Sequence, residues 1–166
     1  MIAVRARDQA WEPTLPPAKK RTALIVDDDP TLRYVLARLA RLAGYDILEA
    51  NDADTALAHA ARTLPDVVVA DIRLPDFDGF ELCSRLKTAK TTKGIPVLLV
   101  TSMYYESASS ATSIAAGKKR AKEAGALDLL PRGEAVEKLG ECLKKLGTKK
   151  IHAKNVVKST LTAKKK

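Results

Sequence analysis

The sequence of 166 residues has few aromatic residues, few cysteines and no long apolar run. Aromatic residues make up 4% of the chain, so Leu, Val, Ile and Ala must fill any core. The two cysteines, Cys83 and Cys142, are too few for a disulfide framework and lack metal-binding spacing. Apolar runs are strand-sized, well short of the roughly 18 residues of a membrane span, and residues 1–10 lack the apolar core of a secretory signal. We therefore expect a cytoplasmic globular protein without a membrane span.

The charge of the chain is unevenly placed. The formal net charge is +9, and residues 144–166 alone hold nine lysines and no acidic residue. Residues 1–143 hold 20 basic and 20 acidic residues, so the remainder is neutral. We expect a disordered Lys-rich tail over 147–166, able to make nonspecific contacts with nucleic acid. Three prolines within 1–20 predict a flexible leader, which leaves 21–146 as the folded domain.

Apolar runs alternate with segments of helical periodicity across the domain. Strands are expected at 22–26, 45–49, 67–70, 95–100 and 126–130. Helices are expected from Pro30 to about residue 42, over 52–64 and 80–88, in a segment that ends near 124, and up to about 146. This alternation predicts an α/β fold, a doubly wound five-stranded parallel sheet with helices on both faces.

Acidic residues stand where two of the expected strands end. Asp27 and Asp28 follow the first strand, and Asp71 follows the third. Ligands of such sheets bind beyond the carboxyl ends of the strands, so these side chains could share one pocket. Clustered carboxylates need a compensating cation, and oxygen ligands with open positions suit Mg²⁺. A carboxylate in this setting could attack a phosphoryl donor and form an aspartyl phosphate.

Two further side chains could hold the phosphoryl group. Thr101 ends the fourth strand with a hydroxyl group, and Arg132 follows the fifth strand with a fixed positive charge. A structural interpretation is also open, because an Asp at a strand end often caps the next helix. The run 26–30 could be a single helix start with several capping residues. The coincidence of acids, hydroxyl and cation at four strand ends favours the functional interpretation.

The motifs that carry this pattern resemble the receiver domain of response regulators over residues 21–146. The matching segments are Val26-Asp27-Asp28-Asp29-Pro30, 65–71, 74–79, 95–102 and Gly125-Ala126. The resemblance implies a flavodoxin-like fold with strand order 2-1-3-4-5, and a phosphoacceptor that is not a turnover enzyme. It implies these roles: Asp71 as phosphoacceptor, Asp28 and Asp71 as direct Mg²⁺ ligands, Asp27 as a ligand through water, Arg73 as a ligand through its backbone carbonyl, and Thr101 as switch hydroxyl.

The resemblance also implies partners. The phosphoryl group would come from a sensor histidine kinase or a phosphotransfer protein, and an unidentified downstream protein would contact the surface around the fourth helix. Three features depart from the family pattern. Arg132 stands in place of the usual Lys, Leu129 in place of a frequent aromatic residue, and the span 102–124 is longer than usual and carries Tyr104 and Tyr105.

Two other functions remain open on these residues. The departures at Leu129 and Arg132 are compatible with a protein-interaction module that works without phosphorylation. A metal-dependent phosphatase of the haloacid-dehalogenase type also uses an Asp at a strand end. That chemistry wants a second acid two residues later, where this chain has Arg73.

Overall fold

The structure is a computed structural model that describes residues 20–101 and 110–162, with side chains for 20–101 and 114–147. Within these residues, parallel strands form one sheet in the order β2-β1-β3-β4-β5, as the sequence predicts. The strands are β1 (Arg21–Val26), β2 (Tyr45–Ala50), β3 (Val67–Asp71), β4 (Val97–Thr101) and β5 (Asp128–Pro131). The chain reverses its direction across the sheet after β2, which places the switch in strand order between β1 and β3.

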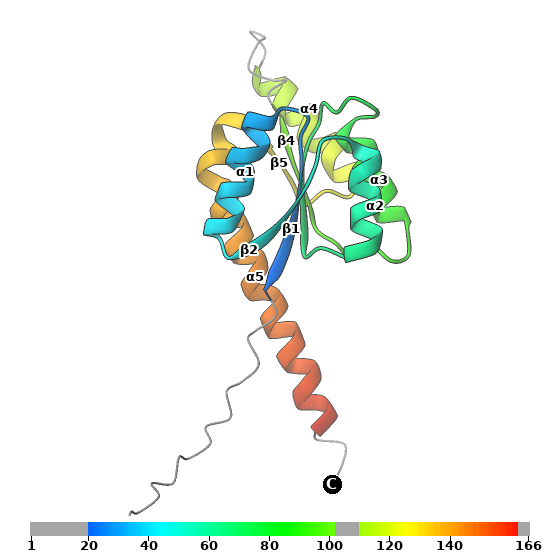
Figure 1. The fold of residues 1–166 in the computed structure, drawn as a ribbon, viewed down its shortest axis with the longest axis vertical. Coiled ribbons are helices and arrows are strands. Elements are labelled where there is room, and N and C mark those ends of the chain that lie inside the picture. The colour runs from blue at the N-terminus through cyan, green and yellow to red at the C-terminus, as the bar shows by residue number, and fades with distance from the viewer. Residues whose placement is uncertain (1–19, 102–109, 163–166) are drawn as a thin grey trace, which may run out of the picture.

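Helices cover both faces of the sheet (Figure 1). One face carries α1 and α5, and the other carries α2, α3 and α4. The helices are α1 (Pro30–Leu42), α2 (Ala53–Thr63), α3 (Gly79–Thr88), α4 (Ser110–Glu123) and α5 (Arg132–Thr162). This arrangement confirms the predicted doubly wound α/β fold.

The central strand β3 is buried on both faces, which explains its uninterrupted apolar sequence. Val67 and Val69 point into the core beneath α1 and α5, together with Leu36 and Leu139. Val68 and Ala70 point into the core beneath α2, α3 and α4. Because its side chains are committed to both cores, the strand holds the position of its last residue, Asp71.

Aspartates begin three of the helices. The carboxylates of Asp29, Asp52 and Asp78 accept hydrogen bonds from backbone N–H groups in the first turns of α1, α2 and α3. Asp29 therefore serves as the cap of α1, with Pro30 at the first helical position. The run of three acids after β1 is thus divided: one residue caps the helix and the two before it do not.

The expected bounds of the last two strands are shifted. β4 begins at Val97 rather than at residue 95, because Pro96 has no N–H and the Ile95 N–H closes a turn on the Thr92 carbonyl. β5 begins at Asp128 rather than at residue 126, because Gly125 has a left-handed φ of +86° and the Ala126 N–H caps the end of α4.

The last helix is longer than expected. The backbone of α5 remains helical to Thr162, where the sequence suggested a disordered tail from residue 147. Figure 1 shows this helix projecting beyond the amino ends of the strands. The segment contains no proline and is rich in lysine, which favours helix. In the described parts of the chain, no helix combines the length and apolar character needed to cross a bilayer.

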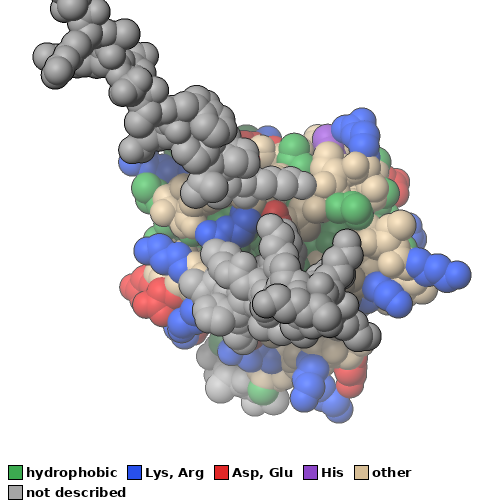
Figure 2. All heavy atoms as spheres, turned by 90° about the horizontal axis from the view of Figure 1, so that it is seen from below, with side chains coloured by type: hydrophobic (Ala, Val, Ile, Leu, Met, Phe, Trp, Pro, Cys, Tyr) green, Lys and Arg blue, Asp and Glu red, His purple; other side chains and the backbone are tan. Residues whose placement is uncertain are grey.

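Some expectations fall outside the described residues. They concern the Pro-containing leader up to residue 19, and Tyr104 and Tyr105 in the long connection after β4. Figure 2 views the end of the domain from which α5 projects. On the visible part of this face, described Lys and Arg side chains are scattered rather than gathered in one patch.

Candidate functional site

Three carboxylates meet at the carboxyl ends of β1 and β3. Asp27 and Asp28 follow β1, and Asp71 is the last residue of β3. One oxygen from each of these side chains lies within 4.8 Å of the other two. Asp27 and Asp71 are 0% and 2% exposed, whereas Asp28 is exposed. The cluster is therefore a buried acidic pair with its third member open to solvent.

Burial makes the charged forms of the inner pair unfavourable. It raises the pKa of Asp27 from 3.8 to about 7, although Asp27 Oδ1 accepts a hydrogen bond of 2.9 Å from the Asp29 N–H. The negative charge of Asp71 contributes to this rise. Burial also raises the pKa of Asp71, against a 3.1 Å hydrogen bond from the Arg73 N–H to Oδ2. A cation beside these carboxylates would stabilise their ionised forms.

The inner pair also has unused oxygen atoms. Among the described residues, no hydrogen-bond donor contacts the buried atoms Asp27 Oδ2 and Asp71 Oδ1. A buried carboxylate oxygen without a donor is costly in a folded protein. Hard oxygen ligands of this kind, with an exposed third acid, fit a small divalent cation such as Mg²⁺. The residues present therefore match the expected Mg²⁺ site in chemistry and in spacing.

The loop after β3 is tightly packed around Asp71. The Gly79 N–H donates to the Ile72 carbonyl at 2.8 Å. A Cβ atom at Gly79 would lie 2.3 Å from the Asp71 carbonyl oxygen, so this position requires glycine. Asp76 ties the same loop to α2, because its two carboxylate oxygens accept the N–H groups of Ala53 and Asp54 at 3.0 and 2.8 Å.

The sequence did not predict this role of Asp76. Burial raises the pKa of the Asp76 carboxyl, and four hydrogen bonds from backbone N–H groups lower it. The hydrogen bonds outweigh burial, so the pKa lies below its usual range. Its partners lie 22 and 23 residues earlier in the chain. A contact of this kind leaves no periodic signal, and only the motif over 74–79 marks the loop as special.

The predicted hydroxyl and cation stand at the neighbouring strand ends. Thr101 is the last residue of β4 and is 1% exposed, one position beyond Val100, which pairs with Asp71. Arg132 begins α5 directly after β5. Its positive charge lowers the pKa of both Asp27 and Asp71, and its buried Nε donates no hydrogen bond within the described structure. The Arg132 charge thus acts on the acidic pair.

Leu129 occupies the core under α4 instead of the surface. It is 1% exposed and belongs to the same apolar cluster as Ala121 of α4. An aliphatic side chain here has no polar end that could reach solvent or Thr101.

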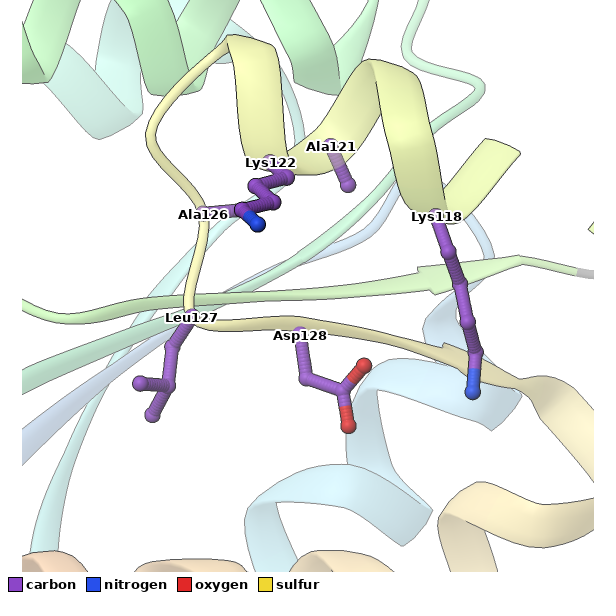
Figure 3. Close-up of a pocket in the computed structure, with 6 residues that line it drawn as sticks. All are labelled: Lys118, Ala121, Lys122, Ala126, Leu127 and Asp128. Atoms are coloured by element: carbon purple, nitrogen blue, oxygen red, sulfur yellow. The ribbon is translucent and has the colours of Figure 1, made fainter. Parts of the chain in front are cut away.

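A surface hollow lies between α4 and the amino end of β5. It has a volume of about 380 Å³. Figure 3 shows Lys118 and Lys122 of α4 on one wall and Leu127 and Asp128 on the other. Leu127 is 57% exposed, so the hollow offers apolar surface beside two lysines.

Comparisons with a family model and with curated proteins point to the same family. The model of the response regulator receiver domain matches residues 23–144. Response regulator PleD of Caulobacter vibrioides is 43% identical over 81 residues, 48% of this chain and 18% of PleD. The gliding motility regulatory protein of Myxococcus xanthus is 31% identical over 147 residues, 87% of this chain and 18% of that protein. The chain covers less than half of the length of either relative.

Solved structures agree with these relatives. A candidate response regulator from Chloroflexus aurantiacus is 33% identical with a TM-score of 0.66, and the match covers 77% of this chain and 98% of that one. Chemotaxis response regulator CheY4 of Vibrio cholerae is 27% identical with a TM-score of 0.64, over 76% of this chain and 98% of that one. The chain belongs to the response regulator receiver domain family, a family of signalling phosphoacceptors.

Proposed function

We propose that the chain is a two-component response regulator that accepts a phosphoryl group on Asp71. The observation that carries the proposal is the buried Asp71 Oδ1, which accepts no hydrogen bond from the described residues and lies in the carboxylate cluster. The donor would be a phosphohistidine of a sensor histidine kinase or a phosphotransfer protein. The Asp71 oxygen forms a new O–P bond as the donor N–P bond breaks. The imidazole nitrogen keeps the electron pair and takes up a proton, and an acyl phosphate results.

Four residues would hold Mg²⁺ for this reaction. They are Asp28 and Asp71 through their carboxylates, Asp27 through water, and Arg73 through its backbone carbonyl. When bound, the ion supplies positive charge that offsets the repulsion between carboxylate and phosphoryl oxygens. Asp27 and Asp71 act with it by staying ionised. The protein assists its own modification and does not turn over a substrate.

Thr101 and Arg132 are proposed to bind the phosphoryl oxygens once the bond has formed. The Thr101 hydroxyl can donate one hydrogen bond, and the Arg132 guanidinium can donate two in parallel. The buried Arg132 Nε, without an acceptor among the described residues, supports this role. A planar guanidinium donates its hydrogen bonds in a fixed fork, whereas the ammonium group of the usual Lys is a compact point charge. The geometry of the contacts with the phosphoryl group would therefore differ from the family pattern.

The surface around α4 is the proposed site for the downstream partner. The hollow in Figure 3 combines the exposed Leu127 with Lys118 and Lys122, which suits an amphipathic segment with acidic residues. The lysines of 144–166 would add nonspecific attraction to nucleic acid.

A second function is supported by Leu129. Without an aromatic side chain at this position, the domain could bind its partner regardless of phosphorylation. Partner binding that is unchanged in Asp71→Asn and in the absence of Mg²⁺ would support this module. Loss of binding in both conditions would support the switch.

The phosphoacceptor proposal is tested by incubating the purified chain with acetyl phosphate and Mg²⁺. We expect an acid-labile mass increase of one phosphoryl group, which is absent in Asp71→Asn. The matched control is Asp46→Asn, which removes an exposed carboxylate of β2 and should leave the modification intact. A modified Asp71→Asn protein would refute Asp71 as the acceptor.

A further inference from the structure

Helix α4 has few apolar anchors. In its described part, residues 114–123, the buried residues are Gly117 and Ala121. α3, on the same face of the sheet, buries Phe80, Leu82 and Leu86. Small side chains remove little apolar surface from water, so packing stabilises the position of α4 less than that of α3. Polar contacts must contribute more to holding α4 in place.

Arg120 supplies such a contact between α4 and the first turn of α3. Its Nη2 donates to Asp78 Oδ2 at 2.8 Å, and its Cζ lies 4.2 Å from the centroid of the Phe80 ring. The other carboxylate oxygen of Asp78 accepts from the Glu81 N–H and caps α3. Phe80 is only 3% exposed. The guanidinium therefore contacts two neighbouring residues that are themselves fixed.

The same turn of α3 lies against the backbone of Asp71. Gly79, between the two Arg120 partners, donates its N–H to Ile72 and has no room for a Cβ beside the Asp71 carbonyl oxygen. A shift at Asp78 therefore reaches the Asp71 main chain through a single tightly packed residue. The path from Arg120 to the acid cluster consists of an ion pair, a helix cap and the packing of a glycine.

We propose that Arg120 is a positioning residue that ties α4 to the first turn of α3 and thereby sets the position of the Asp71 main chain. The proposal rests on the proposed function of Asp71 as acceptor. Arg120 takes no part in the bond changes of phosphoryl transfer; it holds the loop that carries the nucleophile. Since coupling between two sites is reciprocal, a phosphoryl group on Asp71 would in turn alter the tether and the position of α4.

The first test compares phosphorylation rates of variants of the 166-residue chain with acetyl phosphate and Mg²⁺. Arg120→Ala should slow phosphorylation about three- to thirtyfold, the combined range for one exposed ion pair and one ring contact. Lys119→Ala removes the same charge from the adjacent exposed position and should match the native rate. Asp78→Asn keeps a helix cap and the ring contact of Arg120 but loses the ion pair, so it should be slowed, though by no more than Arg120→Ala. The double variant should be no slower than Arg120→Ala alone.

A second readout does not depend on phosphorylation. In the unmodified protein, Arg120→Ala should speed hydrogen exchange of the Gly79 amide, Lys119→Ala should not, and Arg120→Lys should restore part of the protection. The proposal is overturned if Arg120→Ala matches Lys119→Ala in rate and exchange, or if the Asp78 and Arg120 effects multiply. If the native chain takes up no phosphoryl group, the proposed function fails, and the exchange data still decide whether Arg120 holds the loop.

Discussion

At the carboxyl edge of the sheet, the ends of β1 and β3 hold three carboxylates, whereas the ends of β4 and β5 hold Thr101, Arg132 and the adjoining helix α4. We call these regions the acid half and the helix-4 half. The acid half is tightly packed, with Gly79 against Asp71 and large buried side chains in α3. The helix-4 half relies on small buried residues and on the exposed ion pair of Arg120 with Asp78.

This difference suggests how a change at the acidic pair could alter the position of α4. In the acid half, burial makes the ionised forms of Asp27 and Asp71 unfavourable. Neutralising or modifying these two carboxylates therefore changes the free energy of unfolding substantially. In the helix-4 half, α4 is held by small buried residues and an exposed ion pair, so it can change position with little loss of free energy. A phosphoryl group added in the acid half would thus change the position of α4.

The largest expected effect concerns the pH dependence caused by Asp27. Its pKa rises from 3.8 to about 7 on folding, so folded Asp27 keeps a proton that the unfolded chain loses between these values. The free energy of unfolding should therefore fall as pH rises from about 4 to about 7, with an upper bound of about 4 kcal/mol at 1.4 kcal/mol per pKa unit. Asp27→Asn should be more stable than the native chain at pH 8 in chelator-containing buffer.

Urea denaturation between pH 4 and pH 8 measures this effect. Asp46→Asn, which changes an exposed carboxylate, should follow the native pH profile. If the free energy of unfolding of Asp27→Asn and of the native chain changed with pH in parallel, burial of Asp27 would not be the cause of the pH dependence.

The next prediction sets the two halves directly against each other. Leu82 of α3 is 0% exposed and Ala121 of α4 is 1% exposed. Leu82→Ala should lower the free energy of unfolding by about 3 kcal/mol, because it leaves a cavity. Ala121→Gly should lower it by about 1 kcal/mol, mainly through helix propensity. Equal losses measured by urea denaturation would remove the distinction between the helices.

Packing at Gly79 should have a smaller effect. Gly79→Ala forces the Asp71 main chain to move and should destabilise the protein by about 2 kcal/mol. Gly94→Ala is the matched control, because nothing lies within 4 Å of its added Cβ. Thermal unfolding of both variants provides the comparison, and a Gly79→Ala protein as stable as Gly94→Ala would contradict the tight packing of the acid half.

The smallest effect is stabilisation by Mg²⁺. At ten times its dissociation constant, an ion that binds only the folded state adds about 1.4 kcal/mol to the free energy of unfolding. Asp28→Asn should reduce this gain, since it removes the solvent-facing member of the cluster. Asp46→Asn should keep the full gain. An equal response of the two variants to added MgCl₂ would argue against Asp28 as a ligand.

The sequence predicted the sheet and the meeting of the acids for the same physical reason. Strands such as Val67–Asp71 are apolar throughout because they are buried on both faces, and a parallel sheet brings their carboxyl ends to one edge. Asp27, Asp28 and Asp71 could therefore be assigned to one place before any contact was known.

Contacts between distant side chains could not be predicted in this way. Arg120 and Asp78 are 42 residues apart, and Asp76 contacts Ala53 across 23 residues. Such pairs follow no period in the sequence, and they depend on how the helices are placed over the sheet. Lys118, Lys119 and Arg120 look alike in a basic run, yet it is Arg120 that pairs with Asp78 and lies over the Phe80 ring.

The central claim is that Asp71 receives the phosphoryl group, and chemical mapping of the modified residue tests it most directly. The chain is incubated with acetyl phosphate and Mg²⁺, reduced with borohydride, digested and sequenced by mass spectrometry. Borohydride converts an aspartyl phosphate to homoserine, so the proposed function predicts homoserine at position 71. Homoserine at Asp27 or Asp28 with Asp71 unchanged, or no homoserine at all, would contradict it.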